Sequence, residues 1–205
     1  QLDILDNILE YYDDGVSEEI FNKLDKNEKK IDKYEVKLDN QIINVIVLYK
    51  PVASDLRQLF AIYRMVINLE RIGDLVMKIV GFIKKIKDSE LLKKSSGLLR
   101  NMLKVTSKMT NNALLSFTNM DNKGAFKIMK KDTDIDGVSN RILKKTIKSS
   151  EESEEFQGLL ISMSDISSII SSIERIGDHS TNIAEASVYA LLGENVMHKK
   201  SDKKD

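Results

Sequence analysis

The chain has 205 residues, of which 41% are hydrophobic and 6% aromatic, so it can bury the core of one large domain or two small ones. Lysine plus arginine and aspartate plus glutamate both number 32, and this balance leaves no basic surplus to favour nucleic acid as a partner. Cysteine is absent, which excludes disulfides and cysteine nucleophiles, and no apolar run approaches the roughly 20 residues of a membrane span.

Apolar residues recur at helical spacing along most of the chain and predict an all-α protein. Segments rich in small or polar residues, and the single proline, Pro51, separate the helices. The predicted helices cover residues 2–13, 17–49, 52–86, 90–119, 122–149 and 153–192. The charged tail, residues 198–205, has too little apolar content to pack, and we expect it to be disordered.

A five-residue string occurs twice in the chain. Glu70-Arg-Ile-Gly-Asp74 returns letter for letter as Glu174-Arg-Ile-Gly-Asp178, 104 positions later. The same offset aligns apolar positions along two helices of each half. We therefore predict two tandem three-helix bundles, over residues 1–87 and 88–197. The repeat also predicts that about fourteen residues of the first helix precede Gln1, so that this helix is truncated here.

Carboxylate pairs at four-residue spacing occupy equivalent places in the two halves. Such a pair shares one face of a helix, one turn apart. If the two helices that carry them pack antiparallel, four carboxylates gather in each half, and their repulsion calls for cations or shared protons. Hard oxygen ligands suit magnesium, calcium, manganese or iron. The predicted metal ligands are Glu28, Asp32, Glu70 and Asp74 in the first half, and Asp132, Asp136, Glu174 and Asp178 in the second.

A single pair of this kind has a simpler explanation, because an acidic chain carries several by composition and most form salt bridges on a solvated face. The repetition in register is what favours metal binding. Gly73 and Gly177 lie between the repeated carboxylates, although a helical glycine costs about 1 kcal/mol relative to alanine. Close helix approach explains them better than room for a metal-bound ligand. Arg71 and Arg175 are expected to pair with a neighbouring helix, and His179 to lie at a rim or interface.

Several segments are similar to the signature strings of the PhoU family: 50–57, 69–74, 173–179 and 182–185. The resemblance covers nearly the whole chain and implies two three-helix bundles with multinuclear metal clusters on the eight carboxylates named above. It implies a negative regulator of phosphate uptake and phosphate-starvation signalling, which binds the ATPase of a phosphate ABC transporter and a sensor histidine kinase from the cytoplasmic side of the inner membrane. The expected cofactors are iron, manganese, magnesium or zinc, and we expect a homodimer.

The first half departs from this pattern at one position. Lys78 stands where the second half has Asn182, and a cation beside the first site is expected to weaken metal binding there. The second cluster is therefore the stronger prediction.

Two other functions fit the same residues. One is the cytosolic PhoU-like regulatory domain of a sodium–phosphate cotransporter, separated from its membrane part. The other is a metal-dependent phosphatase in which carboxylate-bound ions activate water. The sequence contains no phosphate-binding loop or nucleophile elbow, and neither histidine stands three residues after a glutamate as in di-iron bundle enzymes. We therefore expect a regulator that is not an enzyme.

Overall fold

The computed structural model describes residues 1–10, 16–86, 89–131, 154–194 and 196. Within these ranges the regular elements are helices, so the all-α prediction is confirmed: α1 (Leu2–Glu10), α2 (Glu18–Tyr49), α3 (Ser54–Lys85), α4 (Ser89–Thr118), α5 (Asn122–Lys131) and α7 (Glu154–Leu192). Where they can be compared, the boundaries lie within two residues of the predicted ones. The predicted helix ends at residues 13 and 149 and the tail at 198–205 lie outside the described residues.

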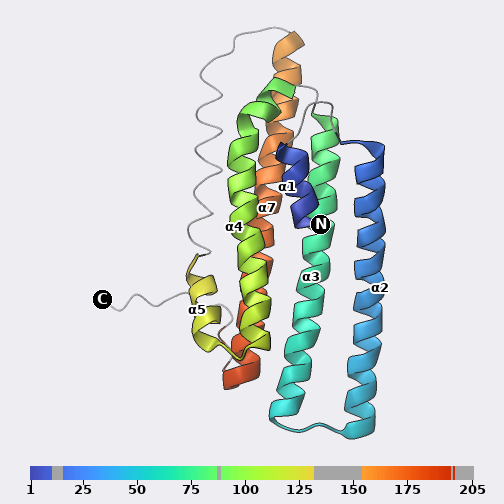
Figure 1. Ribbon diagram of the computed structural model, residues 1–205, viewed down its shortest axis with the longest axis vertical. Coiled ribbons are helices and arrows are strands. Elements are labelled where there is room, and N and C mark those ends of the chain that lie inside the picture. Colours follow the sequence, from blue (N-terminus) through green and yellow to red (C-terminus); the bar gives the residue numbers. More distant parts are fainter. Residues whose placement is uncertain (11–15, 87–88, 132–153, 195, 197–205) are drawn as a thin grey trace, which may run out of the picture.

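The helices form an elongated bundle in which α3 and α7 run antiparallel (Figure 1). The contact between α3 and α7 is the most extensive one, and α4 and α5 also pack on α7. α2 packs on α3, whereas α1 packs mainly on α4. None of the helices among the described residues is both long and apolar enough to cross a membrane. The division into domains at residues 87 and 88 stays a prediction, since these two residues are outside the described ranges.

Local signals explain why the ends of α2 could be predicted. The Ser17 Oγ accepts a hydrogen bond of 3.3 Å from the Ile20 N–H and so caps the first turn. At the other end Lys50 adopts a left-handed conformation, with φ 48°, and its N–H donates to the Ile46 carbonyl at 3.1 Å. Pro51 follows directly and cannot continue the helix.

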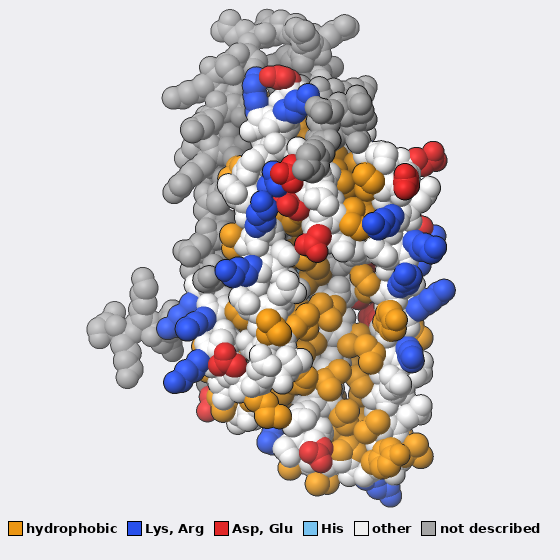
Figure 2. Space-filling view, in the orientation of Figure 1, with side chains coloured by type: hydrophobic (Ala, Val, Ile, Leu, Met, Phe, Trp, Pro, Cys, Tyr) orange, Lys and Arg blue, Asp and Glu red, His pale blue; other side chains and the backbone are white. Residues whose placement is uncertain are grey.

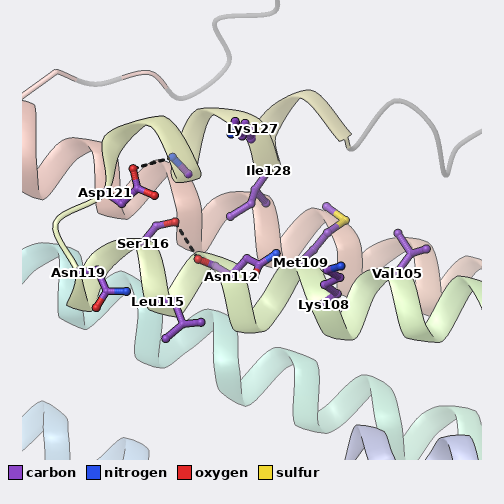
Figure 3. Close-up of a pocket in the computed structure, with 11 residues that line it drawn as sticks. Val105, Lys108, Met109, Asn112, Leu115, Ser116, Asn119, Asp121, Lys127 and Ile128 are labelled. Atoms are coloured by element: carbon purple, nitrogen blue, oxygen red, sulfur yellow. Dashed lines mark hydrogen bonds between the residues drawn. The ribbon is translucent and has the colours of Figure 1, made fainter.

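The turn from α4 to α5 is held by side chains (Figure 3). The Asp121 carboxylate accepts a hydrogen bond of 3.0 Å from the Gly124 N–H, and the Ser116 Oγ donates to the Asn112 carbonyl at 2.8 Å. An open cavity of about 450 Å³ lies beside this turn; its lining includes Val105, Lys108, Met109, Lys127 and Ile128. None of the six predicted metal ligands that the structure describes lines it.

Apolar side chains remain exposed where α2 turns into α3, at the lower right of Figure 2. Here Val47, Leu48, Tyr49 and Val52 are between 64% and 76% exposed. We call these four residues the turn surface. A group of large apolar side chains at one end of a bundle is a candidate contact surface for another protein.

Candidate carboxylate site

The carboxylate of Glu28, on α2, faces the repeated string of α3. A Cβ atom added at Gly73 would lie 2.8 Å from the Glu28 Oε2 and 3.0 Å from Oε1, and 3.2 Å from the Ile31 Cδ1. Both oxygens of Glu28 therefore sit against the α3 backbone at the position between Glu70 and Asp74. A side chain at this position would force the ends of the Glu28 and Ile31 side chains to move. The structure supports the close-approach interpretation of Gly73.

Only one oxygen of Glu28 has a hydrogen-bond donor among the described residues. The Gln1 Nε2 donates to Oε2 at 2.7 Å, whereas Oε1 is buried without a partner. A buried acceptor without a donor costs free energy because it has lost its water. An oxygen in this state is a suitable ligand for a cation.

Neighbouring carboxylates act on Glu28. Burial raises the pKa of Glu28 most, and the hydrogen bond from Gln1 lowers it. The negative charges of Asp32, Asp74 and Asp25 then raise the pKa further. Asp74 belongs to α3, so carboxylates of α2 and α3 act on one another electrostatically in the first half of the chain.

Glu70 belongs to the same group. Its side chain is 16% exposed, and burial raises its pKa most, with the charge of Asp74 next. The charges of Glu35 and Glu28 add to this effect. Glu35 is not among the predicted ligands. It pairs with Asp39 at four-residue spacing, but the 104-residue offset puts Ser139 and Leu143 in the equivalent positions, so this pair is not repeated in the second half. The seven-residue separation from Glu28, which is two helical turns, could have found it.

Arg71 partly neutralises these carboxylates and lowers the pKa of Glu70. Its guanidinium lies 3.4 Å from the Glu70 Oε2 and 3.5 Å from the Asp74 Oδ2. Both partners belong to α3, so the prediction that Arg71 pairs with a neighbouring helix is wrong for the described residues. The long side chain lies along its own helix and reaches the carboxylate of Asp74, three residues later. Because the side chain is 57% exposed, these ion pairs stabilise the fold little.

Lys78, which is expected to weaken metal binding at the first site, contacts an aromatic ring on its own helix. Its Nζ lies over the ring of Phe82, 5.8 Å from the centroid, so the side chain extends along α3 toward the next turn. The ammonium group therefore has an aromatic partner on its own helix.

The predicted ligands are placed unequally. Glu28, Glu70 and Asp74 lie around Gly73, while Asp32 is exposed but acts on Glu28. Among the described residues, no three carboxylates or histidines converge closely enough to form a ready-made metal site. Asp132 and Asp136 are outside the described ranges, so Glu174 and Asp178 are seen without the pair predicted to face them. The eight metal ligands stay a prediction.

His179 lies in the interface between α3 and α7. Its Nδ1 is 2.8 Å from the Asn68 Oδ1, and the Asn182 Nδ2 donates to the same oxygen at 3.1 Å. The Asn68 Nδ2 donates to the Arg64 carbonyl at 2.7 Å, which fixes the orientation of the amide. Because Oδ1 can only accept, Nδ1 of His179 carries a proton. We call this contact the Asn68–His179 bridge.

The fold and the site define a class: all-helical proteins built from two related halves, with carboxylates gathered where helices of one half approach closely. Residues 2–83 and 99–187 match the PhoU domain. The chain therefore belongs to the PhoU family, and the resemblance drawn from its signature strings is confirmed.

Named relatives and a solved structure agree with this assignment. The phosphate-specific transport system accessory protein PhoU homologue of Burkholderia is 31% identical over 182 residues, which are 84% of this chain and 73% of the relative. The homologue with the same name in Clostridium acetobutylicum is 29% identical over 194 residues, 92% of this chain and 83% of the relative. The crystal structure of PhoU from Pseudomonas aeruginosa superposes with a TM-score of 0.78 at 25% identity, covering 94% of this chain and 89% of that one.

The first prediction concerns the glycine below Glu28. Gly73→Ala puts a methyl group within 3.0 Å of both Glu28 oxygens, so the end of this side chain must move, and the gain of about 1 kcal/mol expected from helix propensity should be reduced or lost. Gly81→Ala on the same helix meets nothing within 4 Å and should gain about 1 kcal/mol from helix propensity. Chemical denaturation of both variants measures the difference. Equal gains in the two would show that Glu28 does not lie against Gly73.

The second prediction concerns pH. The pKa of Glu28 is raised in the folded state, so its contribution to stability is present below its ordinary value of 4.5 and is lost as the pH rises through the folded-state pKa. Glu28→Gln removes this loss, and in metal-free protein the variant should gain stability relative to the parent as the pH rises from 4.5 toward neutrality. Urea unfolding at several pH values measures it. Glu90→Gln, at a 71% exposed side chain, reports the general effect of losing a surface carboxylate; the same trend in both variants would contradict the assignment.

Proposed function

We propose that the chain is a metal-binding negative regulator of phosphate uptake and phosphate-starvation signalling, and that it is not an enzyme. The single observation that carries the metal-binding part is the Glu28 carboxylate set against Gly73, between Glu70 and Asp74. Family membership supports the phosphate part, because the relatives are named as accessory proteins of a phosphate-specific transport system.

The residues of the first half fit a divalent cation. Glu28 offers a buried oxygen without a donor, and Glu70 and Asp74 are close enough to act on it or on each other electrostatically. Carboxylate oxygens are the preferred ligands of magnesium and suit manganese and iron as well. When bound, a cation supplies positive charge that offsets the repulsion among the carboxylates. Arg71, loosely held and exposed, offsets that repulsion only in part.

The proposed ligands are the eight predicted carboxylates, with the first four in one cluster and the last four in another. Iron, manganese, magnesium and zinc are the candidate ions. Ion binding would stabilise the folded state, since the unfolded chain cannot gather carboxylates from different helices. Metal occupancy would thus set the rigidity of the surfaces that partners contact.

The proposed partners are the ATPase of a phosphate ABC transporter and a sensor histidine kinase, bound from the cytoplasmic side by a homodimer. The turn surface is the apolar region that supports such docking, because four large side chains there are more than 60% exposed. Burial of apolar area of this kind drives most protein association.

Metal binding is tested with chelator-treated protein. Manganese titrated by calorimetry should bind the parent, and the double variant Glu28→Gln, Glu70→Gln should lose at least about tenfold in affinity for one class of ion, because each substitution removes a charged ligand. Glu90→Gln is the matched control on an exposed glutamate. A parent that binds no manganese, iron, magnesium or zinc would rule out the metal-binding part.

Docking is tested by co-purification with the phosphate transporter ATPase and the sensor kinase of the same organism. The parent should retain at least one of them, and Leu48→Ser with Tyr49→Ser should weaken retention by about tenfold or more, since both side chains would lose apolar contact area. The exposed Ile161→Ser on α7 serves as the control, with a side chain 63% exposed far along the chain from the turn. Failure of the parent to retain either partner would count against the regulatory part.

A further inference from the structure

The Asn68–His179 bridge fixes the register between α3 and α7. Arg71 comes three residues after Asn68, and Arg175 comes four residues before His179. Each arginine therefore lies one helical turn from the bridge, on the same face as the residue that forms it. Because α3 and α7 are antiparallel, the step forward from Asn68 to Arg71 and the step back from His179 to Arg175 run toward the same end of the bundle (Figure 1). This register places the two arginines near one another at the edge of the interface.

The internal repeat makes this placement symmetric. In an antiparallel pair each residue forward on α3 matches a residue back on α7, so the bridge brings Arg71 opposite Ile176, the residue next to Arg175. Arg71 and Arg175 are also equivalent under the 104-residue offset. They consequently lie where the pseudo-twofold axis that relates α3 to α7 crosses the interface. The duplicated string therefore brings two equivalent arginines, Arg71 and Arg175, to the same place in the bundle.

The electrostatics agree with this geometry. Burial lowers the pKa of His179 most, and the charges of Arg175 and then Arg71 lower it further, so both guanidinium groups are near the ring. Arg71 is held by Glu70 and Asp74 only at 3.4 and 3.5 Å. Arg175 makes no ion pair with any residue that the structure describes. Two cations that act on the same ring attract an anion, which competes with Glu70 and Asp74 for Arg71.

We propose that Arg71 and Arg175 bind free inorganic phosphate at the edge of the α3–α7 interface. A guanidinium presents paired N–H donors that match two oxygens of a tetrahedral oxyanion, and two guanidiniums can hold it from both sides. Asn182 is exposed beside the bridge, and its amide keeps a second hydrogen after donating to Asn68. Both arginine side chains are exposed, so phosphate reaches them directly from solvent.

The site also connects to the carboxylate cluster, and this part of the inference rests on the proposed metal binding. A cation on Glu70 and Asp74 competes with Arg71 for the same oxygens and releases the guanidinium. Phosphate affinity should therefore rise when metal is bound, and phosphate should tighten metal binding by the same factor. Such a regulator would respond to the phosphate concentration by binding phosphate directly.

Equilibrium dialysis with radiolabelled inorganic phosphate tests the site, at low ionic strength, first with metal-free protein and then with manganese. Arg175→Gln and Arg71→Gln should each lower phosphate affinity by about tenfold, the loss expected for one charge-assisted contact. Lys108→Gln, at an exposed cation on α4, is the matched control and should stay within about twofold of the parent. Phosphate should also raise the melting temperature of the parent but not of Arg175→Gln.

Phosphate binding that survives Arg175→Gln unchanged, or that falls equally in Lys108→Gln, overturns the site. A preference for a phosphomonoester such as glycerol phosphate over inorganic phosphate also overturns it, since the arginines would then belong to a phosphorylated partner. The metal-free titration keeps the two proposals apart. Phosphate binding without any cation binding removes the proposed metal function and leaves this site standing. Cation binding without phosphate binding in either condition removes this site alone.

Discussion

The antiparallel packing of α3 against α7 is the contact on which the rest of the structure depends. It joins the two halves of the chain, and α2, α4 and α5 pack on one or other member of this pair, whereas α1 packs mainly on α4. Its stability comes from aliphatic side chains that are fully buried on both helices, such as Ile79, Ile173 and Ile176, each contributing about 1.5–3 kcal/mol. Aliphatic packing alone tolerates alternative registers. The Asn68–His179 bridge selects one, because a shift by a turn would leave polar groups without partners.

The contact between α2 and α3 contains a buried carboxylate that does not favour stability. An interface optimised for stability would place an apolar side chain at position 28, since burying a carboxylate and leaving one oxygen without a donor is unfavourable. The chain instead removes the side chain at Gly73 to make room for Glu28 and supplies one hydrogen bond from Gln1. Neighbouring carboxylates then raise the pKa of Glu28 and of Glu70. Departures from the most stable choice concentrate at functional positions, and these three features concern the same group of oxygens.

Helix positions could be predicted because they depend on local signals. The apolar period, the Ser17 cap and Pro51 act within a few residues of each boundary, and the repeated string identified which helices correspond. Side-chain partners could not be predicted in the same way. Arg71 reaches Glu70 and Asp74 on its own helix through its length, while the bridge from His179 to Asn68 depends on the register of two helices far apart in sequence.

The same limit applies within the carboxylate group. Spacing placed Glu28, Glu70 and Asp74 on the right faces, and it could not show that Asp32 is exposed or that Glu35 joins the group. Those outcomes depend on the distance and rotation of α2 relative to α3, which Gly73 and the bulk of Ile31 set. Periodicity gives the direction of a side chain from its helix axis, whereas burial depends on the neighbouring helix.

Adjacent residues of the repeated string point in different directions and so contact different parts of the bundle. Consecutive positions of a helix point about 100° apart, so Glu70 and Arg71 address different neighbours although they are adjacent in sequence. Glu70 turns toward α2 of its own half, and Arg71 stands at the edge of the contact with the other half. Duplicating such a string gives each half its own set of carboxylates, while the two arginines meet at one shared place. In the arrangement that we propose, cation binding is therefore a property of each half, and phosphate binding is a property that only the joined halves possess.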